Sequence, residues 1–172
     1  MRQPVNKAMR GCQSVLDPEG TPLFTGFWNP RVIFDVLSQG DPAFWHGKRV
    51  LDIGANTSGL SLELARAGAS VTALEPDPYG TTRTVVRPLL DRLIQDEGLH
   101  IELRDEGLFD AQGLGDFDAV LCLGLVYHFR DPQYVLDWLS QLNFVSLFVS
   151  TQTGPGEGFE LTNRRDPRIG LP

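Results

Sequence analysis

The chain has 172 residues, of which 41% are hydrophobic and 22% are charged, and its net charge of −7 gives the surface no overall attraction for nucleic acid. This length is typical of one domain, which buries roughly 70% of the unfolded surface around a single core. No apolar run approaches the ~18 residues of a membrane span, and the N-terminus lacks the apolar centre of a signal peptide, so we expect a cytoplasmic protein without a membrane partner.

Residues 1–30 predict an irregular arm, because they are rich in Gly, Pro and polar residues and show no hydrophobic period. Three aromatic residues near its end either pack on the following elements or form a lid over a ligand site: Phe24, Phe27 and Trp28. Asn29 and Pro30 indicate the start of a short helix over residues 31–38. The residues expected to face the core from this helix are Val32, Ile33 and Val36.

A β-α-β unit over residues 48–77 is the most informative stretch. Its parts are a strand over 50–53, a small-residue turn over 54–59, a helix over 60–67 and a strand over 70–74. Gly54 opens the turn, where a quick reversal from strand to helix leaves little room for a Cβ atom. Free N–H groups at the helix start favour an anionic group, and Glu75, 21 residues after Gly54, is placed to accept ribose hydroxyls. The unit therefore predicts a site for a nucleoside that carries an anionic group.

The turn distinguishes between nucleotide-binding families. Residues 52–56 read D-I-G-A-N, whereas a nicotinamide-binding turn reads G-x-G-x-x-G. The segment resembles motif I of the Rossmann-like S-adenosylmethionine-dependent methyltransferases, in its D-x-G-x-N variant. The resemblance implies S-adenosylmethionine as cofactor, with the methionine part on the turn backbone, the ammonium end ordered by Asp52, and the ribose on Glu75. The implied cofactor-binding residues here are Asp52, Gly54, Ala55, Asn56, Glu75 and Pro76. Ser58 departs from the pattern, because many relatives have glycine there and a positive φ would strain a serine.

A long helix should follow Pro78 and end at Gly98. Its apolar residues recur at steps of three and four: Val85, Val86, Leu89, Leu90, Leu93 and Ile94. Arg83, Arg87 and Arg92 lie mostly off this stripe, so we expect them on a solvated face rather than in a binding patch.

A third strand is expected over residues 99–103, followed by the acids Asp105 and Glu106. In the methyltransferases that the turn resembles, this loop often supplies an acid to the adenine amino group. The resemblance implies that role for Asp105 or Glu106 and leaves the choice open.

Residues 117–123, FDAVLCL, predict a strand that is buried on both faces of a parallel sheet. Cys122 in this strand is expected to be a packed thiol, and we expect no disulfide and no structural metal. Asp131 and Pro132 then begin a helix as N-cap and first helical residue. The loop between the two elements lies at the carboxyl end of the sheet, where ligands of open α/β sheets bind.

This loop carries a second resemblance. The segment LGLVYHFRDP, residues 123–132, looks like the L-G-x-x-Y-H-x-x-x-P motif of a methyltransferase subgroup that includes enzymes modifying the wobble uridine of tRNA. The resemblance places Leu123 at the cofactor, and Tyr127 and His128 beside the transferable group. Either could take a proton from a hydroxyl acceptor, and Arg130 could pair with an acidic group of the substrate. Packing remains the alternative for Tyr127, and a structural hydrogen bond for His128.

A fifth strand is expected over residues 144–150. The resemblance covers residues 47–152 and implies an α/β fold, a Rossmann-like three-layer sandwich with a mainly parallel sheet of about five strands in the order 3-2-1-4-5. The family's further helix and antiparallel strands have no counterpart, so the chain is expected to be truncated at its C-terminus. A bare fifth strand would favour a homodimer through that edge. We expect an arm over 1–30, an S-adenosylmethionine-binding domain over 31–152 and a Gly/Pro-rich tail over 153–172.

These features together predict an S-adenosylmethionine-dependent methyltransferase that acts on an unidentified small-molecule acceptor. One alternative is a non-catalytic or truncated module that binds the cofactor without turnover. A second alternative is a tRNA-modifying enzyme, which the acidic net charge disfavours.

Overall fold

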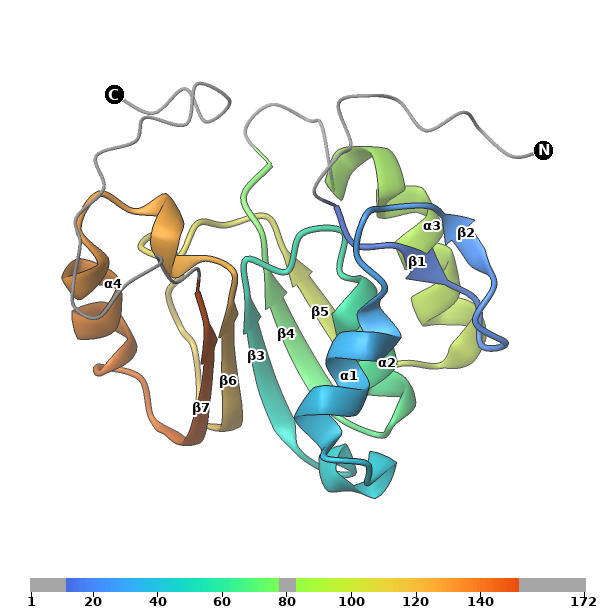
Figure 1. Cartoon of the computed structure of the whole chain (residues 1–172), viewed down its shortest axis with the longest axis horizontal. Coiled ribbons are helices and arrows are strands. Elements are labelled where there is room, and N and C mark those ends of the chain that lie inside the picture. The colour runs from blue at the N-terminus through green and yellow to red at the C-terminus, as the bar shows by residue number, and fades with distance from the viewer. Residues whose placement is uncertain (1–11, 78–82, 152–172) are drawn as a thin grey trace, which may run out of the picture.

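A five-stranded parallel sheet forms the centre of the computed structural model, which describes residues 12–77 and 83–151 (Figure 1). In spatial order its strands are β5 (Ile101–Arg104), β4 (Ser70–Leu74), β3 (Arg49–Ile53), β6 (Phe117–Leu123) and β7 (Phe144–Ser150). Every neighbouring pair runs parallel. Counted along the chain from β3, this is the order 3-2-1-4-5, which confirms the predicted fold class.

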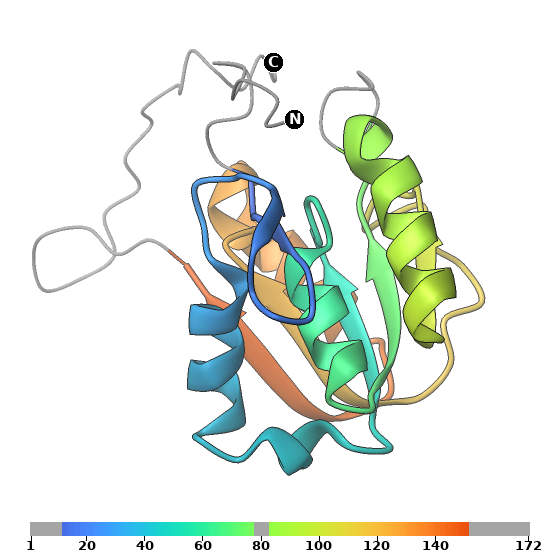
Figure 2. The same ribbon diagram turned by 90° about the vertical axis from the view of Figure 1, so that its right-hand side faces the viewer.

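Helices cover both faces of the sheet and complete three layers (Figures 1 and 2). On one face lie α1 (Pro30–Ser38), α2 (Gly59–Arg66) and α3 (Arg83–Glu97), and on the other lies α4 (Pro132–Leu139). Two short 3-10 helices, η2 (Pro42–Trp45) and η3 (Val126–His128), precede β3 and follow β6. Within the described residues, no helix has the length and apolar character to cross a membrane. The cytoplasmic location stays a prediction.

The helices α1 and α4 begin at the predicted caps. The Asn29 side chain accepts a hydrogen bond from the Arg31 N–H at 3.0 Å, and the Asp131 side chain accepts one from the Gln133 N–H at 3.1 Å. A proline follows each cap residue, where the helix needs no N–H donor. These local signals explain why the sequence located both helix starts correctly.

Side chains on β3 and β6 alternate between two cores, one on each face of the sheet. Toward α2 lie residues such as Val50 and Leu121, and toward α4 lie Leu51, Val120 and Cys122. Burial on both faces gives the continuous apolar runs that the sequence shows. Burial also raises the pKa of Cys122 to about 11, which confirms the prediction of a packed thiol.

The helix α1 packs through a stripe that shares only Ile33 with the one predicted, and the expectation for Ile33 is confirmed. Val32 and Val36 are 61% and 71% exposed, so the expectation that they face the core is wrong. Instead, Ile33, Phe34 and Leu37 pack against the core under α1. These three form an alternative helical stripe of larger side chains, which bury more apolar area than valines.

The arm is not wholly irregular, which corrects the prediction for residues 1–30. Two short strands, β1 (Val15–Leu16) and β2 (Pro22–Phe24), pair antiparallel. Val15 is fully buried in a cluster with Leu62 of α2 and Leu90 of α3, so the hairpin is fastened to the helical layer. The domain limits at residues 30 and 152 remain predictions, and the expected tail lies outside the described residues.

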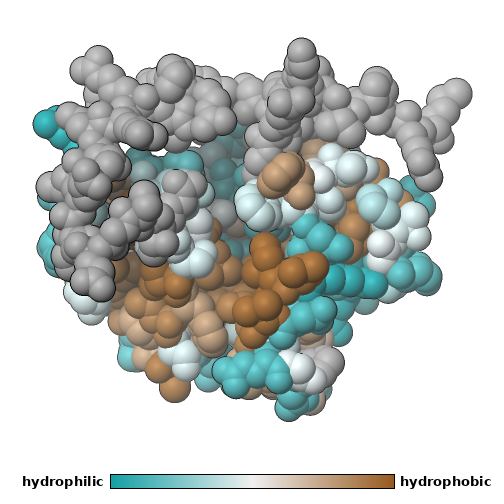
Figure 3. Space-filling model, viewed as in Figure 1, coloured by the Kyte–Doolittle hydropathy of each residue, from teal (hydrophilic) through white to brown (hydrophobic). Residues whose placement is uncertain are grey.

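The strand β7 lies at an edge of the sheet, since β6 is its one partner within the described ranges. Val145, Leu147 and Val149 are 81%, 37% and 45% exposed, and we call them the β7 surface. Hydrophobic residues gather in Figure 3 on the side where Figure 1 draws β7 and α1. This edge is therefore apolar as well as unpaired.

Candidate functional site

The turn after β3 has the geometry that its sequence predicts. Gly54 has a φ of +71°, and a Cβ atom there would lie 3.1 Å from the Leu125 side chain. The N–H groups of Gly54 and Ala55 both donate to the carbonyl oxygen of Leu74 at 2.9 Å. The turn therefore bends sharply back to the end of β4, and its first position favours glycine.

The backbone of the turn contacts the acid that ends β4. The Asn56 N–H donates to Glu75 Oε2 at 2.7 Å, although 19 residues separate the two. Glu75 Oε1 accepts no hydrogen bond from the described residues. Burial raises the pKa of Glu75, while the Asn56 N–H and the nearby Arg83 charge lower it. Among the described residues, the carboxylate therefore holds the turn through one oxygen and leaves the other without a donor.

Asp52 lies beneath the turn and is buried. Ser61 donates its hydroxyl to Asp52 Oδ2 at 2.6 Å. Burial raises the pKa of Asp52 to about 6, opposed by the Ser61 hydrogen bond and the Arg83 charge. With this pKa the carboxyl group is mostly ionised at pH 7 and takes up a proton as the pH falls through about 6. Its role in ordering the turn stays a prediction.

The N-terminal arm occupies part of the helix start that the sequence left free. Gln13 Oε1 accepts from the Leu60 N–H at 2.8 Å, and the Gln13 N–H donates to Asn56 Oδ1 at 3.0 Å. The Thr57 hydroxyl also donates to the Gln13 carbonyl at 2.8 Å. The expectation of a free N–H at the start of α2 is wrong for Leu60. Gln13 was missed because it lies 47 residues before its partner and belongs to no motif.

Both acids after β5 form ion pairs. Asp105 is 60% exposed and accepts from Arg87 at 3.1 Å. Glu106 is paired with Arg104 at 2.8 Å. Pro76 is exposed, immediately after Glu75. Of the two acids proposed for adenine, Asp105 is the more exposed.

The arginines of α3 do not all lie on a solvated face. Arg92 does, with its side chain 78% exposed, whereas the Arg83 side chain is 1% exposed and lies behind the turn. The prediction for Arg83 is therefore wrong. Its partners come from three other segments of the chain, which a helical pattern cannot reveal.

The loop after β6 lies next to the turn, because Leu125 packs against Gly54. Leu123 is half-buried against the core, and buried Val126 anchors η3. The rings of Tyr127 and His128 lie 4.4 Å apart, and Tyr127 is 43% exposed. Tyr127, His128 and Arg130 are all exposed. Because Leu125 packs against Gly54, the loop that carries them lies beside the turn after β3.

An exposed aromatic pair stands close to the turn. Phe27 and Trp28 are 72% and 53% exposed and meet edge to face at 4.9 Å, so packing is the wrong interpretation for these two. Trp28 forms a β-bridge with Gln13, whose side chain caps α2. Phe24 packs partly buried against α2 and α3, as expected. The lid role of the pair stays a prediction.

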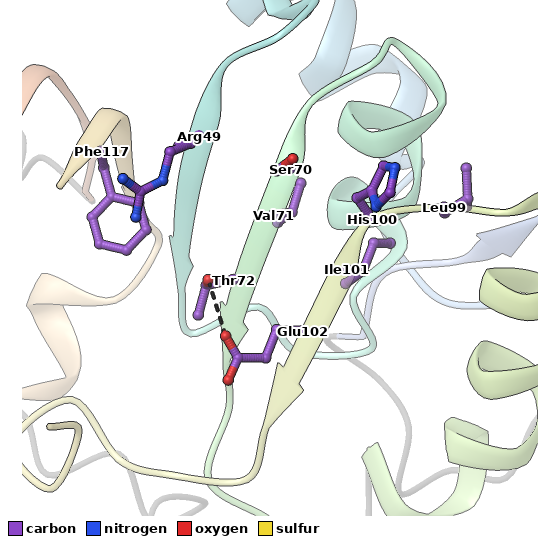
Figure 4. A pocket seen from close by; sticks show the side chains of 9 residues that line it. All are labelled: Arg49, Ser70, Val71, Thr72, Leu99, His100, Ile101, Glu102 and Phe117. Atoms are coloured by element: carbon purple, nitrogen blue, oxygen red, sulfur yellow. Dashed lines mark hydrogen bonds between the residues drawn. The ribbon is translucent and has the colours of Figure 1, made fainter. Parts of the chain in front are cut away.

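A hollow of about 440 Å³ lies at the opposite end of the sheet (Figure 4). It is lined by residues at the starts of the strands, including Arg49, Ser70 and Phe117, and by Thr72, whose hydroxyl is 3.5 Å from the Glu102 carboxylate. Ligands of parallel sheets bind at the carboxyl ends, so this hollow is not part of the candidate site.

Comparison with known proteins adds independent evidence. The family model described as "Methyltransferase domain" matches residues 28–157. The chain is 32% identical over 142 residues to a ubiquinone biosynthesis O-methyltransferase of Xylella fastidiosa (strain 9a5c), which is 74% of this chain and 54% of the relative. It is 38% identical over 96 residues to one of Aromatoleum aromaticum, covering 56% of this chain and 39% of the relative. The chain spans about half the length of the curated relatives it matches.

Solved structures are similar to this chain in fold, and some of them in sequence as well. The N-terminal domain of EvdMO1, crystallised with S-adenosylhomocysteine (SAH) and D-fucose, superposes with a TM-score of 0.57 at 26% identity. The match covers 83% of this chain and 60% of that domain. Coclaurine N-methyltransferase superposes with a TM-score of 0.59 at 18% identity, covering 83% of this chain and 42% of that one, and shows the shared fold alone.

Proposed function

Because the chain belongs to the methyltransferase domain family, we propose that it binds S-adenosylmethionine at the carboxyl ends of β3 and β4 and transfers the methyl group to a small-molecule acceptor. The observation that carries this proposal is the Glu75 carboxylate, whose Oε2 accepts from the Asn56 N–H of the turn while Oε1 accepts no hydrogen bond from the described residues. A carboxylate oxygen in this position suits the ribose hydroxyls. The residues around the turn therefore fit the cofactor.

Each end of the cofactor has a candidate partner. The backbone of residues 54–56 holds the methionine part, and the buried Asp52 carboxylate favours its ammonium group from below. The Asp105 carboxylate is the better placed acid for the adenine amino group, since it is the more exposed. Pro76 and Leu123 border the nucleoside at the ends of β4 and β6.

The cofactor supplies a methyl group on a positively charged sulfur, which is already reactive. The bond from the acceptor to the methyl carbon forms as the carbon–sulfur bond breaks, and the sulfur keeps the electron pair. The chain contributes alignment and exclusion of water. For a hydroxyl acceptor, His128 or Tyr127 takes the proton, and Arg130 pairs with an acidic group of the substrate.

A hydroxylated small molecule is the acceptor class that we propose. The relatives named above are O-methyltransferases, and the exposed Phe27 and Trp28 give the same end of the molecule an apolar surface. Such a surface favours an acceptor with an aromatic or other apolar part. The lid role of the pair belongs to this proposal.

The test is transfer of labelled methyl from S-adenosylmethionine to the small-molecule, tRNA and protein fractions of an extract. We expect label in the small-molecule fraction. Tyr127→Phe or His128→Gln should lower the rate by about 100-fold while SAH binding is kept, if that residue is the base. Tyr134→Phe is the matched control, because this tyrosine is also exposed, at 59%, but lies on α4.

Two other outcomes decide between the alternatives. SAH binding without label in any fraction supports a non-catalytic module. Label in tRNA, together with a gel shift of bulk tRNA at low salt, supports the tRNA-modifying subgroup suggested by residues 123–132. The net charge of −7 weighs against that outcome.

We also propose that a second copy of the chain covers the β7 surface. Its three residues are exposed on a strand that has β6 on one side and no strand of the described residues on the other, a combination that favours pairing with another strand. Sedimentation equilibrium should give a dimer for the native chain and a monomer for Val145→Lys. A native chain that stays monomeric at all concentrations would refute this proposal.

A further inference from the structure

A buried arginine stands directly behind the candidate cofactor site. Arg83 is the first residue of α3, and its side chain is 1% exposed. Removing a guanidinium from water costs several kcal/mol unless hydrogen bonds and opposite charges compensate. The partners that compensate it therefore indicate what the residue does.

The guanidinium joins three segments that form the floor of the site. Nη2 donates to Ser58 Oγ at 2.8 Å and to the Ala73 carbonyl at 3.1 Å. Nη1 donates to the Arg104 carbonyl at 2.8 Å. The turn, the end of β4 and the end of β5 are thus tied to one side chain. All three acceptors are neutral, and Nε has no partner among the described residues.

The positive charge is balanced at longer range by acids of the site. Glu75, Asp105 and Asp52 attract the guanidinium, in that order of strength, and Arg87 opposes them. Only Asp105 makes a direct ion pair, at 3.5 Å. In return, Arg83 lowers the pKa of both Asp52 and Glu75, two carboxylates whose pKa is raised by burial.

The same contact accounts for the departure of the turn from the family pattern. Ser58 has a φ of 57°, a left-handed conformation that strains a residue with a Cβ atom by about 1 kcal/mol or more. Glycine would relieve this strain but would offer no hydroxyl. The serine keeps an acceptor for Arg83.

We propose that Arg83 is a positioning residue of the cofactor site, whose guanidinium ties the Ser58 turn to the ends of β4 and β5 and provides the charge that faces Asp52 and Glu75 from behind. The inference rests on the proposed function, since these acids matter here as partners of S-adenosylmethionine. Arg83 acts through them and does not touch the reacting atoms.

The experiment measures SAH affinity by calorimetry between pH 6 and pH 8.5, together with thermal unfolding. The variant is Arg83→Met, which keeps much of the length of the arginine side chain but removes its positive charge. The matched control is Arg87→Met, one turn later on α3 and also paired with Asp105 but 35% exposed. We expect Arg83→Met to bind SAH about tenfold more weakly at pH 7.5, and the loss to grow as the pH falls. Arg87→Met should follow the native profile.

The pH profile separates positioning from a structural role. Without Arg83, the carboxylates of Asp52 and Glu75 take up protons at a higher pH, with Asp77 and Asp105 as the remaining nearby acids. A loss of affinity that is equal at every pH, or native affinity in Arg83→Met, would overturn the inference.

A second variant, Ser58→Ala, decides the matter if Arg83→Met does not fold. SAH binding that is a few-fold weaker at unchanged thermal stability supports the inference, and native affinity overturns it. A native chain that binds no SAH overturns the proposed function as well, whereas native binding with unaffected variants overturns only the role of Arg83.

Discussion

Asp52 offers a sharp test of the idea that the site is built at a cost to stability. Its carboxyl group is buried and accepts a hydrogen bond from Ser61 at 2.6 Å. A pKa of about 6 in place of 3.8 means that holding the ionised form in the fold costs about 3 kcal/mol. Because the folded pKa lies above the unfolded one, protonation favours the fold. The loss of folding stability caused by the ionised carboxylate is therefore complete above pH 6, and it shrinks as the pH falls from 6 toward 3.8.

The perturbation is Asp52→Asn. The asparagine side chain has the same shape as aspartate and keeps an oxygen that can accept from Ser61, but it carries no charge. Urea unfolding at pH 7.5 should show the variant to be more stable than the native chain by up to about 3 kcal/mol. At pH 4 most of this difference should disappear, while SAH affinity at pH 7.5 falls. A variant that is less stable at pH 7.5, or a difference that is the same at both pH values, would refute the reasoning.

Three further predictions concern the surroundings of the turn. Gly59→Ala should lower stability by ~2 kcal/mol in urea unfolding, because the new Cβ atom would lie 2.2 Å from the Ser14 carbonyl oxygen; native stability would contradict the packing of the arm on α2. Gln13→Ala should cost only about 1 kcal/mol in the same assay, since it leaves the Leu60 N–H without its cap; a loss of several kcal/mol would mean that the whole arm detaches. Cys122, with a pKa of about 11, should resist iodoacetamide at pH 8 until the chain unfolds; rapid labelling of the native thiol would show that β6 is accessible.

The elements that the sequence located correctly depend on local signals. Gly54 follows the strand β3 and Glu75 follows β4, and the turn, α2 and β4 succeed one another between them without interruption. The helix start at Asp131 likewise needs only a cap residue and a following proline. The sheet order follows from parallel strands joined by helices together with the resemblance of the turn.

The parts that the sequence did not reveal depend on partners far along the chain. Arg83 follows the helical pattern of a solvated arginine, yet its acceptors belong to Ser58, Ala73 and Arg104. Gln13 lies in a stretch without periodicity and acts through a contact across 47 residues. Such contacts arise only when the layers pack, so neither helical periodicity nor motif spacing predicts them.

Two valines show how a helical stripe can be misjudged. Val32 and Val36 have the spacing of a core-facing pair, but Ile33, which is also predicted to face the core, and Leu37 have the same spacing one residue later. Both stripes satisfy the period, and the larger residues are the ones that pack. Periodicity alone could not choose between them.

Calorimetric titration with SAH tests the central claim, that a nucleoside with an amino-acid tail binds between the Gly54 turn and Glu75. Glu75→Ala is the test variant, and Glu102→Ala is its control, because this acid is exposed on β5. We predict saturable one-to-one binding to the native chain and to the control, and affinity at least about tenfold weaker for Glu75→Ala. No heat of binding with the native chain, or equal affinity in Glu75→Ala, would contradict the account.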